Sequence, residues 1–355
     1  MSKNIYNIPL ALSYDDVLLV PQYSNINSRN DISLETKISP RITLNIPLIS
    51  ANMSDVTDSK MAIALAKLGG LGVIPRFMPI DLQADEVKKV KLEKVLVGAA
   101  VGARNGIVER ASALVKAGVD ILFIDVAHGH MQKNLDATIK LKQMFGNSVD
   151  IVSGNSATYE ATDAIFKAGA DCVKVGIGPG SICTTRIETG SGVPQITAIL
   201  ESARVARLHK KFIIADGGVK TSGDIVKGLA AGASAIMAGG IFAGCDETPG
   251  KLVKRNSKKY KVYNASTSLA EKKKNSLFNR KDTEAHSIKQ IEGVESIVPY
   301  KGSLSALIEK LTANIRSGFS YSGANDINSL WKNAKFVQIT AQGMVESGPH
   351  DVILL

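Results

Sequence analysis

Eight short apolar segments recur along the chain between residues 47 and 242, and each is bounded by glycine or polar residues. They cover residues 47–53, 71–77, 96–102, 121–127, 150–156, 172–178, 212–218 and 235–242. Stretches with helical spacing lie between most of them, at 59–68, 105–117, 134–145, 159–168, 197–208 and 222–230. Strands that are continuous apolar runs are typical of parallel sheets covered on both faces. The alternation therefore predicts an α/β fold, a (β/α)8 TIM barrel, with a doubly wound open sheet as the alternative.

The pattern changes outside these segments. Residues 12–21 form a short apolar strand entered through two acids, and about fifty residues after position 247 show little periodicity. Helical spacing returns at 303–316 and 326–333, followed by a strand or turn at 336–343. Long irregular connections in a compact domain are usually lids or disordered segments. We therefore expect a single barrel domain over residues 1–355, with a flap at about 250–300 and a C-terminal extension.

Polar and glycine residues follow the predicted strands. In (β/α)8 barrels the active site is built from the loops at the carboxyl ends of the strands, and loops after the last two strands commonly bind phosphate. The residues in these positions are Asn52, Met53, Asp125, His128, His130, Gly154, Asn155, Asp216, Gly217, Gly218, Gly239 and Gly240. The fold thus predicts that they converge. A metal site at the two histidines is not expected, because no carboxylate cluster accompanies them.

The loop at residues 174–186 (KVGIGPGSICTTR) is the strongest candidate for chemistry. Alternating glycines allow close approach of the backbone to a ligand, and successive amide groups can cradle an anion such as phosphate. Cys183 follows the last of these glycines on a loop where a thiolate could react. A plain turn and a small buried cysteine are the alternatives. The combination favours a phosphate site beside a cysteine nucleophile.

The net charge of +10 has one source. Residues 251–281 contain eleven Lys or Arg and one Glu, so the rest of the chain is balanced. A balanced body argues against a nucleic-acid partner, whose phosphates require spread or striped cations. The basic segment is either a solvated loop or a lid over an anionic ligand. Three cysteines without metal spacing favour a reducing compartment, the cytoplasm, and no apolar run suggests a membrane span.

Five stretches of this sequence resemble the IMP dehydrogenase and GMP reductase family. They are residues 13–21 (SYDDVLLVP), 176–186 (GIGPGSICTTR), 215–218 (ADGG), 292–295 (EGVE) and 298–302 (VPYKG). The resemblance covers nearly the whole chain and implies the same barrel, usually in a homotetramer. It also implies a purine nucleoside monophosphate as substrate and NAD or NADP as cofactor.

The resemblance assigns roles to individual residues. Cys183 matches the nucleophile that attacks C2 of the purine, and Thr185 and Glu292 match the pair tied to proton transfer. Arg280 aligns with the arginine that activates water in the dehydrogenases. Residues implied in substrate binding are Met53, Ser181, Asp216, Gly218, Gly239, Gly240 and Tyr263. Asp125 and Asn155 would contact the cofactor, and the carbonyl groups of Gly178, Gly180 and Cys183 match a potassium site.

Features of both enzymes are present. The regulatory tandem insert (CBS domains) of many dehydrogenases is missing at residues 91–94, and the flap reads Asn279-Arg280-Lys281 where dehydrogenases have Arg-Tyr. Residues 51–53 and 189–190 look more like reductases, whereas 56–74, 292–304 and 346–352 look more like dehydrogenases. The balance favours an IMP dehydrogenase, which oxidises IMP to XMP with NAD+ through a covalent thioimidate. The alternatives are a GMP reductase using NADPH, a non-catalytic nucleotide-binding homologue, and a flavin-dependent barrel enzyme.

Overall fold

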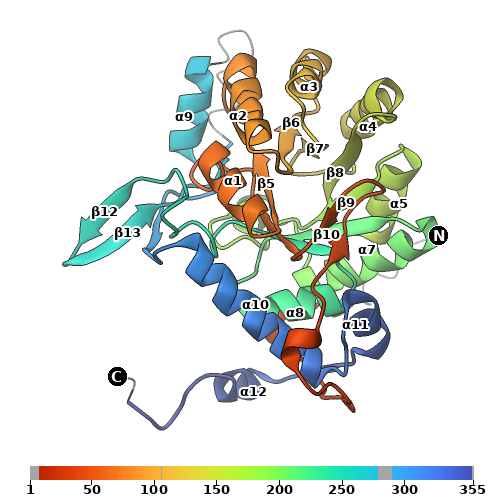
Figure 1. The fold of residues 1–355 in the computed structure, drawn as a ribbon, viewed down its shortest axis with the longest axis vertical. Coiled ribbons are helices and arrows are strands. Elements are labelled where there is room, and N and C mark those ends of the chain that lie inside the picture. Colours follow the sequence, from red (N-terminus) through yellow and green to blue (C-terminus); the bar gives the residue numbers. More distant parts are fainter. Residues whose placement is uncertain (1–7, 105, 279–289, 354–355) are drawn as a thin grey trace.

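Eight parallel strands close into a barrel in the computed structural model, which describes residues 8–104, 106–278 and 290–353 (Figure 1). The strands neighbour one another in the order β10, β11, β4, β5, β6, β7, β8, β9. They are β4 (Leu48–Ser50), β5 (Leu71–Ile74), β6 (Gly98–Val101), β7 (Ile121–Asp125), β8 (Asp150–Ser156), β9 (Cys172–Val175), β10 (Phe212–Asp216) and β11 (Ala235–Ala238). Each coincides with one predicted apolar segment. The (β/α)8 prediction is confirmed, and the open-sheet alternative is wrong.

Helices surround the barrel and cover the outer face of its strands (Figure 1). They are α1 (Ser59–Lys67), α2 (Ile80–Leu92), α3 (Ile107–Lys116), α4 (Gln132–Phe145), α5 (Tyr159–Lys167), α7 (Gln195–His209) and α8 (Ser222–Ala230). Several begin at a residue whose side chain accepts a hydrogen bond from the first turn, such as Asp58 from Met61 N (2.9 Å) and Thr158 from Ala161 N (3.2 Å). Such N-caps satisfy amide groups that the helix leaves free. Helix α2 was not predicted. Four of the five residues at 85–89 are charged, and Val87 alone continues the apolar spacing there.

A segment near the start of the chain pairs with one near its end. Strand β1 (Val17–Leu19) follows the 3-10 turn Tyr14–Asp16 and pairs antiparallel with β15 (Phe336–Gln338). Helix α10 (Leu304–Tyr321) packs on α8, and α11 (Ile327–Asn333) also contacts α8. Other short elements are the 3-10 turn Arg29–Asp31, β2 (Thr36–Lys37), β3 (Thr43–Leu44) and α12 (Ala341–Glu346).

The segment after the barrel is more ordered than its weak periodicity predicted. Strands β12 (Leu252–Arg255), β13 (Lys258–Val262) and β14 (Ile297–Pro299) form a three-stranded antiparallel sheet. Helix α9 (Leu269–Phe278) follows β13. Polar residues alternate irregularly in the two long strands, so their pairing could not be seen in the hydropathy pattern. Among the described residues, no helix has the length and apolar character needed to cross a membrane.

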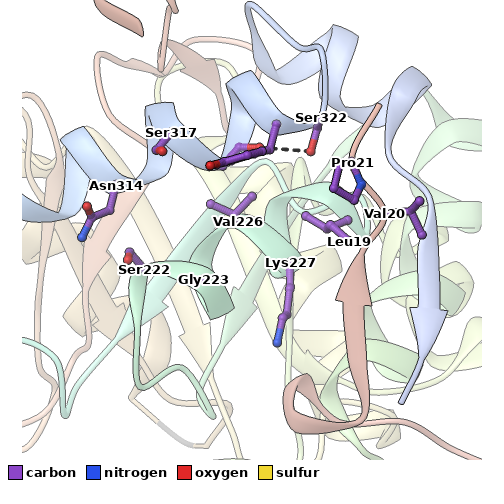
Figure 2. A pocket seen from close by; sticks show the side chains of 12 residues that line it. Leu19, Val20, Pro21, Ser222, Gly223, Val226, Lys227, Asn314, Ser317 and Ser322 are labelled. Atoms are coloured by element: carbon purple, nitrogen blue, oxygen red, sulfur yellow. Dashed lines mark hydrogen bonds between the residues drawn. The ribbon is translucent and has the colours of Figure 1, made fainter. Parts of the chain in front are cut away.

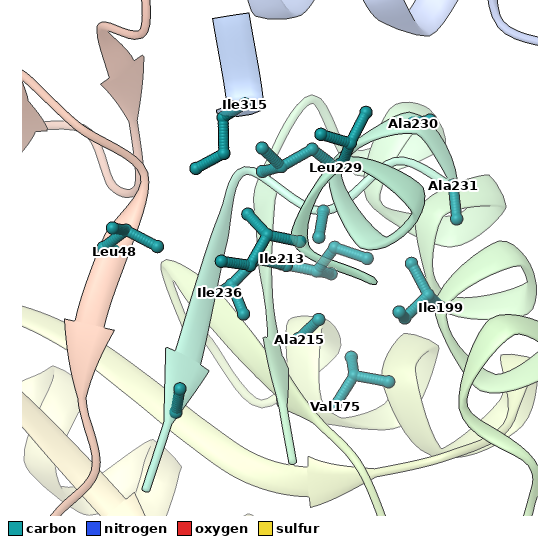
Figure 3. Close-up of a cluster of buried hydrophobic side chains, with 14 of the residues drawn as sticks. Leu48, Val175, Ile199, Ile213, Ala215, Leu229, Ala230, Ala231, Ile236 and Ile315 are labelled. Atoms are coloured by element: carbon teal, nitrogen blue, oxygen red, sulfur yellow. The ribbon is translucent and has the colours of Figure 1, made fainter. Parts of the chain in front are cut away.

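A dense apolar core supports the wall of the barrel that carries β9, β10 and β11. Figure 3 shows Ile213, Ile236 and Leu229 packed together between these strands and helix α8. All three are at most 1% exposed. Burial of an aliphatic side chain of this size stabilises a fold by about 1.5–3 kcal/mol. The loops that leave these strands are therefore anchored on rigid elements.

Candidate active site

Cys183 is the first member of a hydrogen-bonded chain of three side chains. It lies on the loop between β9 and the short helix α6 (Thr185–Thr189), and its thiol donates to Thr185 Oγ1 at 3.1 Å. Thr185 Oγ1 in turn donates to Glu292 Oε2 at 2.8 Å. A thiol, a hydroxyl and a carboxylate in this order form a path along which the proton of the thiol can reach a base. The structure thus brings together three of the four residues that the sequence proposed for catalysis, and the fourth, Arg280, lies outside the described residues.

Backbone pairing holds Glu292 in this position although it lies far from Cys183 in the sequence. Thr184 N donates to the Glu292 carbonyl at 3.0 Å, and Val294 N donates to the Ile182 carbonyl at 3.1 Å. Cys183 and Gly293 form an antiparallel bridge. A Cβ atom on Gly293 would lie 2.2 Å from the Ala265 side chain, so only glycine fits there. The end of the flap segment therefore runs antiparallel to the cysteine loop.

The glycines after β10 allow two loops to touch. Gly217 and Gly218 have φ angles of +91° and +81°, which side chains rarely adopt. A Cβ atom on either residue would come within 3.1–3.2 Å of the Pro179 ring. The loop that carries Cys183 consequently lies directly against the loop after β10.

The glycines after β11 face the side chains of Tyr263, Met53 and Ser181 from other segments. A Cβ atom on Gly239 would lie 2.5 Å from the Tyr263 hydroxyl and 3.1 Å from Met53 Sδ, and one on Gly240 would lie 3.6 Å from Ser181 Oγ. Burial raises the pKa of Tyr263 well above its usual value, so its hydroxyl stays protonated and hydrogen-bonds Ser181. Hydroxyls and backbone amides beside two glycines form a cradle suited to phosphate.

Lys174 joins two carboxylates at the mouth of the barrel. Its side chain is 2% exposed and its ammonium lies 3.0 Å from Asp125 Oδ1 and 2.5 Å from Asp216 Oδ2. Burial favours neutral lysine, but the two carboxylates outweigh it and raise the pKa of Lys174. Burial likewise disfavours ionised Asp125, but Lys174 and Arg76 lower its pKa. Lys174 and Asp125 are therefore both charged near neutral pH.

Asn155 links the same cluster to the cysteine loop. Its Nδ2 donates to the Gly176 carbonyl at 2.7 Å and to Asp216 Oδ2 at 3.0 Å. Its Oδ1 is buried and has no hydrogen-bond partner among the described residues. An unpaired buried acceptor is costly unless a ligand or water satisfies it. Asn155 thus offers a free acceptor at the centre of the site.

Sequence reasoning missed two cations of this site, Lys174 and Arg76. Arg76 follows β5 and stacks over the Phe77 ring at 4.4 Å, and its Nε has no hydrogen-bond partner in the described part of the chain. Burial lowers the pKa of the Arg76 guanidinium, and the negative charge of nearby Asp125 opposes this shift. A lysine inside the apolar run Cys172–Val175 was the available signal, because a charge in a buried strand needs a partner.

Other predicted features are only partly covered. Arg280 lies outside the described residues. In the expected potassium loop, the Gly180 carbonyl accepts a hydrogen bond from Cys183 N at 3.1 Å, which leaves it a second lone pair. The described residues contain no group of three or more His, Cys, Asp or Glu side chains placed to bind a metal ion.

A separate cavity lies away from this site. Figure 2 shows it between β1, α8 and α10, lined by Leu19, Pro21, Val226, Lys227, Asn314 and neighbouring residues, with a volume of about 370 Å³. It contains none of the residues of the cysteine loop.

Comparison with known proteins gives a consistent picture. Residues 11–350 match the model of the IMP dehydrogenase / GMP reductase domain. The inosine-5'-monophosphate dehydrogenase of Nitrosopumilus maritimus is 35% identical over 97% of this chain and 99% of its own length, and that of Borreliella burgdorferi is 39% identical over 96% and 97%. The first alignment spans 477 positions, more than the 355 residues of this chain, so that relative contains segments missing here.

A solved structure agrees with these relatives. The GMP reductase of Trypanosoma brucei, crystallised as a variant with guanosine 5'-monophosphate, superposes with a TM-score of 0.92 and 30% identity. The alignment covers 98% of this chain and 99% of that one. With the barrel, the cysteine loop and these similarities in agreement, the chain belongs to the IMP dehydrogenase / GMP reductase family.

Proposed function

We propose that this protein is an IMP dehydrogenase, which oxidises IMP to XMP with NAD+. The hydrogen-bonded path from Cys183 through Thr185 to Glu292 carries the proposal, because it supplies both a nucleophile and a base. The dehydrogenase is preferred over the reductase because the curated relatives at 35–39% identity are named IMP dehydrogenase.

The reaction proceeds in two chemical stages. The proton of the Cys183 thiol passes through Thr185 to Glu292, and the thiolate forms a bond to C2 of the purine. NAD+, when bound, accepts the hydride that leaves C2. Water then attacks the resulting thioimidate at C2, the carbon–sulfur bond breaks, and XMP and the thiol are released. Splitting one displacement into two easier steps is the advantage of a covalent intermediate.

The nucleotide binds across the loops after β9, β10 and β11 in this proposal. Its phosphate lies against Ser181, Tyr263 and the glycines at 218, 239 and 240, and Met53 contacts the sugar or base. Asp216 uses Oδ2 for Lys174 and Asn155. Oδ1 of Asp216 is thus left to accept a ribose hydroxyl.

The cofactor is assigned to the other half of the barrel mouth. Asp125 accepts from the nicotinamide ribose, and the unpaired Oδ1 of Asn155 can accept from the carboxamide. Arg280, with Lys281 as the alternative, activates the hydrolytic water. Potassium would bind the carbonyl groups of Gly178, Gly180 and Cys183, and we further propose a homotetramer in the cytoplasm.

Mass spectrometry of the acid-quenched enzyme tests the covalent step. Mixed with IMP and NAD+, the wild-type protein should gain the mass of the purine nucleotide on the peptide that carries Cys183. Cys183→Ser should lose this adduct while IMP still raises its melting temperature. A GMP reductase is the second candidate, since the Trypanosoma structure is so named. Absence of any adduct with IMP or GMP, together with nucleotide binding, would favour a non-catalytic homologue.

A further inference from the structure

The β12–β13 ribbon carries a run of exposed positive charge. Residues 254–259 (KRNSKK) are all exposed and include four cations, Lys254, Arg255, Lys258 and Lys259. Figure 1 shows the ribbon projecting from the edge of the molecule, away from the barrel. The basic segment expected as a lid is therefore divided: its first part forms this ribbon, and its later part, from Tyr263 onward, contacts the site.

The strand register places like charges opposite each other. Lys254 pairs with Lys259, and Arg255 pairs with Lys258 at the turn. Partners in an antiparallel pair are about 4.5–5.5 Å apart at Cα, and like charges there are destabilising. None of the four forms an ion pair with a carboxylate of the described chain; Lys259 lies 5.5 Å from the centre of the Tyr300 ring. The fold thus maintains a repulsive arrangement that an anionic partner would relieve.

The turn makes this arrangement rigid. Asn256 and Ser257 both have positive φ angles, +48° and +61°. Two central residues of this conformation form the hairpin turn whose twist matches that of the flanking strands. The base of the ribbon is fixed by the pairing of β13 with β14. The four cations are consequently held on a defined ribbon.

The cations occupy both faces of the ribbon. Successive residues of a strand point to opposite faces, so one face carries Lys254 and Lys259 and the other carries Arg255 and Lys258. A flat acidic protein surface would neutralise only one face. Charge on both faces instead matches a groove with anions along both walls.

From this geometry we infer that the β12–β13 ribbon binds duplex DNA by entering the major groove. That groove is about 12 Å wide and admits a two-stranded ribbon, whereas the major groove of duplex RNA is deep and narrow. The sequence argued against a nucleic-acid partner because the chain outside residues 251–281 has no net charge. The ribbon lies within residues 251–281, so that argument does not apply to it. This inference is independent of the proposed catalytic activity.

Fluorescence anisotropy of a labelled 20-base-pair DNA duplex with the full-length protein tests the inference. With four phosphates neutralised, affinity should fall about 100-fold between 50 and 200 mM KCl. The variant Lys254→Gln/Arg255→Gln should fall only about 10-fold over the same range and bind more weakly at 50 mM. It also removes repulsion across the ribbon, so its circular dichroism and melting temperature should be retained.

The control variant Lys310→Gln/Lys332→Gln removes two exposed lysines from α10 and α11 and should keep the wild-type salt dependence. A matched RNA duplex should bind at least 10-fold more weakly than the DNA. The inference is overturned if no DNA binding occurs at 50 mM KCl, or if the ribbon variant keeps the wild-type dependence. Equal binding of RNA excludes entry into the groove, and equal binding of polyglutamate would indicate an acidic protein partner instead.

Discussion

Replacing Lys174 by methionine should strongly destabilise the protein. The substitution keeps the apolar stem of the side chain but removes an ammonium that lies 3.0 Å from Asp125 and 2.5 Å from Asp216. Its side chain is 2% exposed and the two carboxylates are each 21% exposed. Removing one partner of a buried ion pair costs about 3–5 kcal/mol, because the remaining charge stays buried without compensation. We expect a loss of this size in the free energy of unfolding at pH 7.5.

The loss should become smaller as the pH falls. In the wild-type protein the lowered pKa of Asp125 contributes stability that is present above the unfolded value of about 3.9 and lost only below it. Without Lys174, the buried carboxylates disfavour each other's charge and take up a proton at higher pH. The difference between wild type and variant should therefore narrow from pH 7.5 to pH 5.

Urea unfolding followed by circular dichroism at both pH values measures this difference. Lys88→Met is the matched control, because Lys88 forms a 2.8 Å ion pair with Asp85 in which the side chains are 60% and 55% exposed. Exposed pairs of this kind contribute about 0.2–1 kcal/mol. If the two variants lost equal stability at pH 7.5, or if the Lys174 variant lost the same amount at pH 5, the electrostatic account of the barrel mouth would be wrong.

Three further predictions concern the catalytic and nucleotide sites. Thr185→Ala should lower kcat by about 10²–10⁴ because it interrupts the proton path, whereas Thr185→Ser should restore most of it in a steady-state assay. Gly239→Ala should raise KM for the nucleotide, since its Cβ would lie 2.5 Å from the Tyr263 hydroxyl. Gly240→Ala should raise KM less, because its Cβ would lie 3.6 Å from the nearest atom, Ser181 Oγ. Equal effects of the two variants on KM would contradict the steric reasoning. Iodoacetamide at pH 8 should modify Cys183 alone, because the other two cysteines are fully buried and burial raises their pKa values. Peptide mass spectrometry identifies the modified cysteines, and modification of a second cysteine would contradict this prediction.

The fold was largely predictable because the barrel strands are buried on both faces. Each strand therefore appears as an apolar run such as Ile121–Asp125. Helix α2 and the β12–β13 ribbon were missed for the opposite reason. Their exposed positions are rich in lysine, so hydropathy does not reveal the spacing.

The site was predictable only in part. Glycines in the loops after β9, β10 and β11 indicated where a ligand would lie. These loops are located as soon as the strand ends are known, because the active site of such a barrel lies at the carboxyl ends of its strands. The link between Thr185 and Glu292 joins residues 107 apart, and no local pattern carries such a contact. The same holds for Lys174, whose partners become neighbours only when the barrel closes.

The central claim is tested most directly by the absorbance of reduced nicotinamide in two parallel reactions. One contains the purified enzyme with IMP, NAD+ and potassium, and the other contains the enzyme with GMP and NADPH. An IMP dehydrogenase predicts a rise in the first reaction and no change in the second, with Cys183→Ala silent in both. A fall in the second reaction without a rise in the first would contradict the account and identify a GMP reductase.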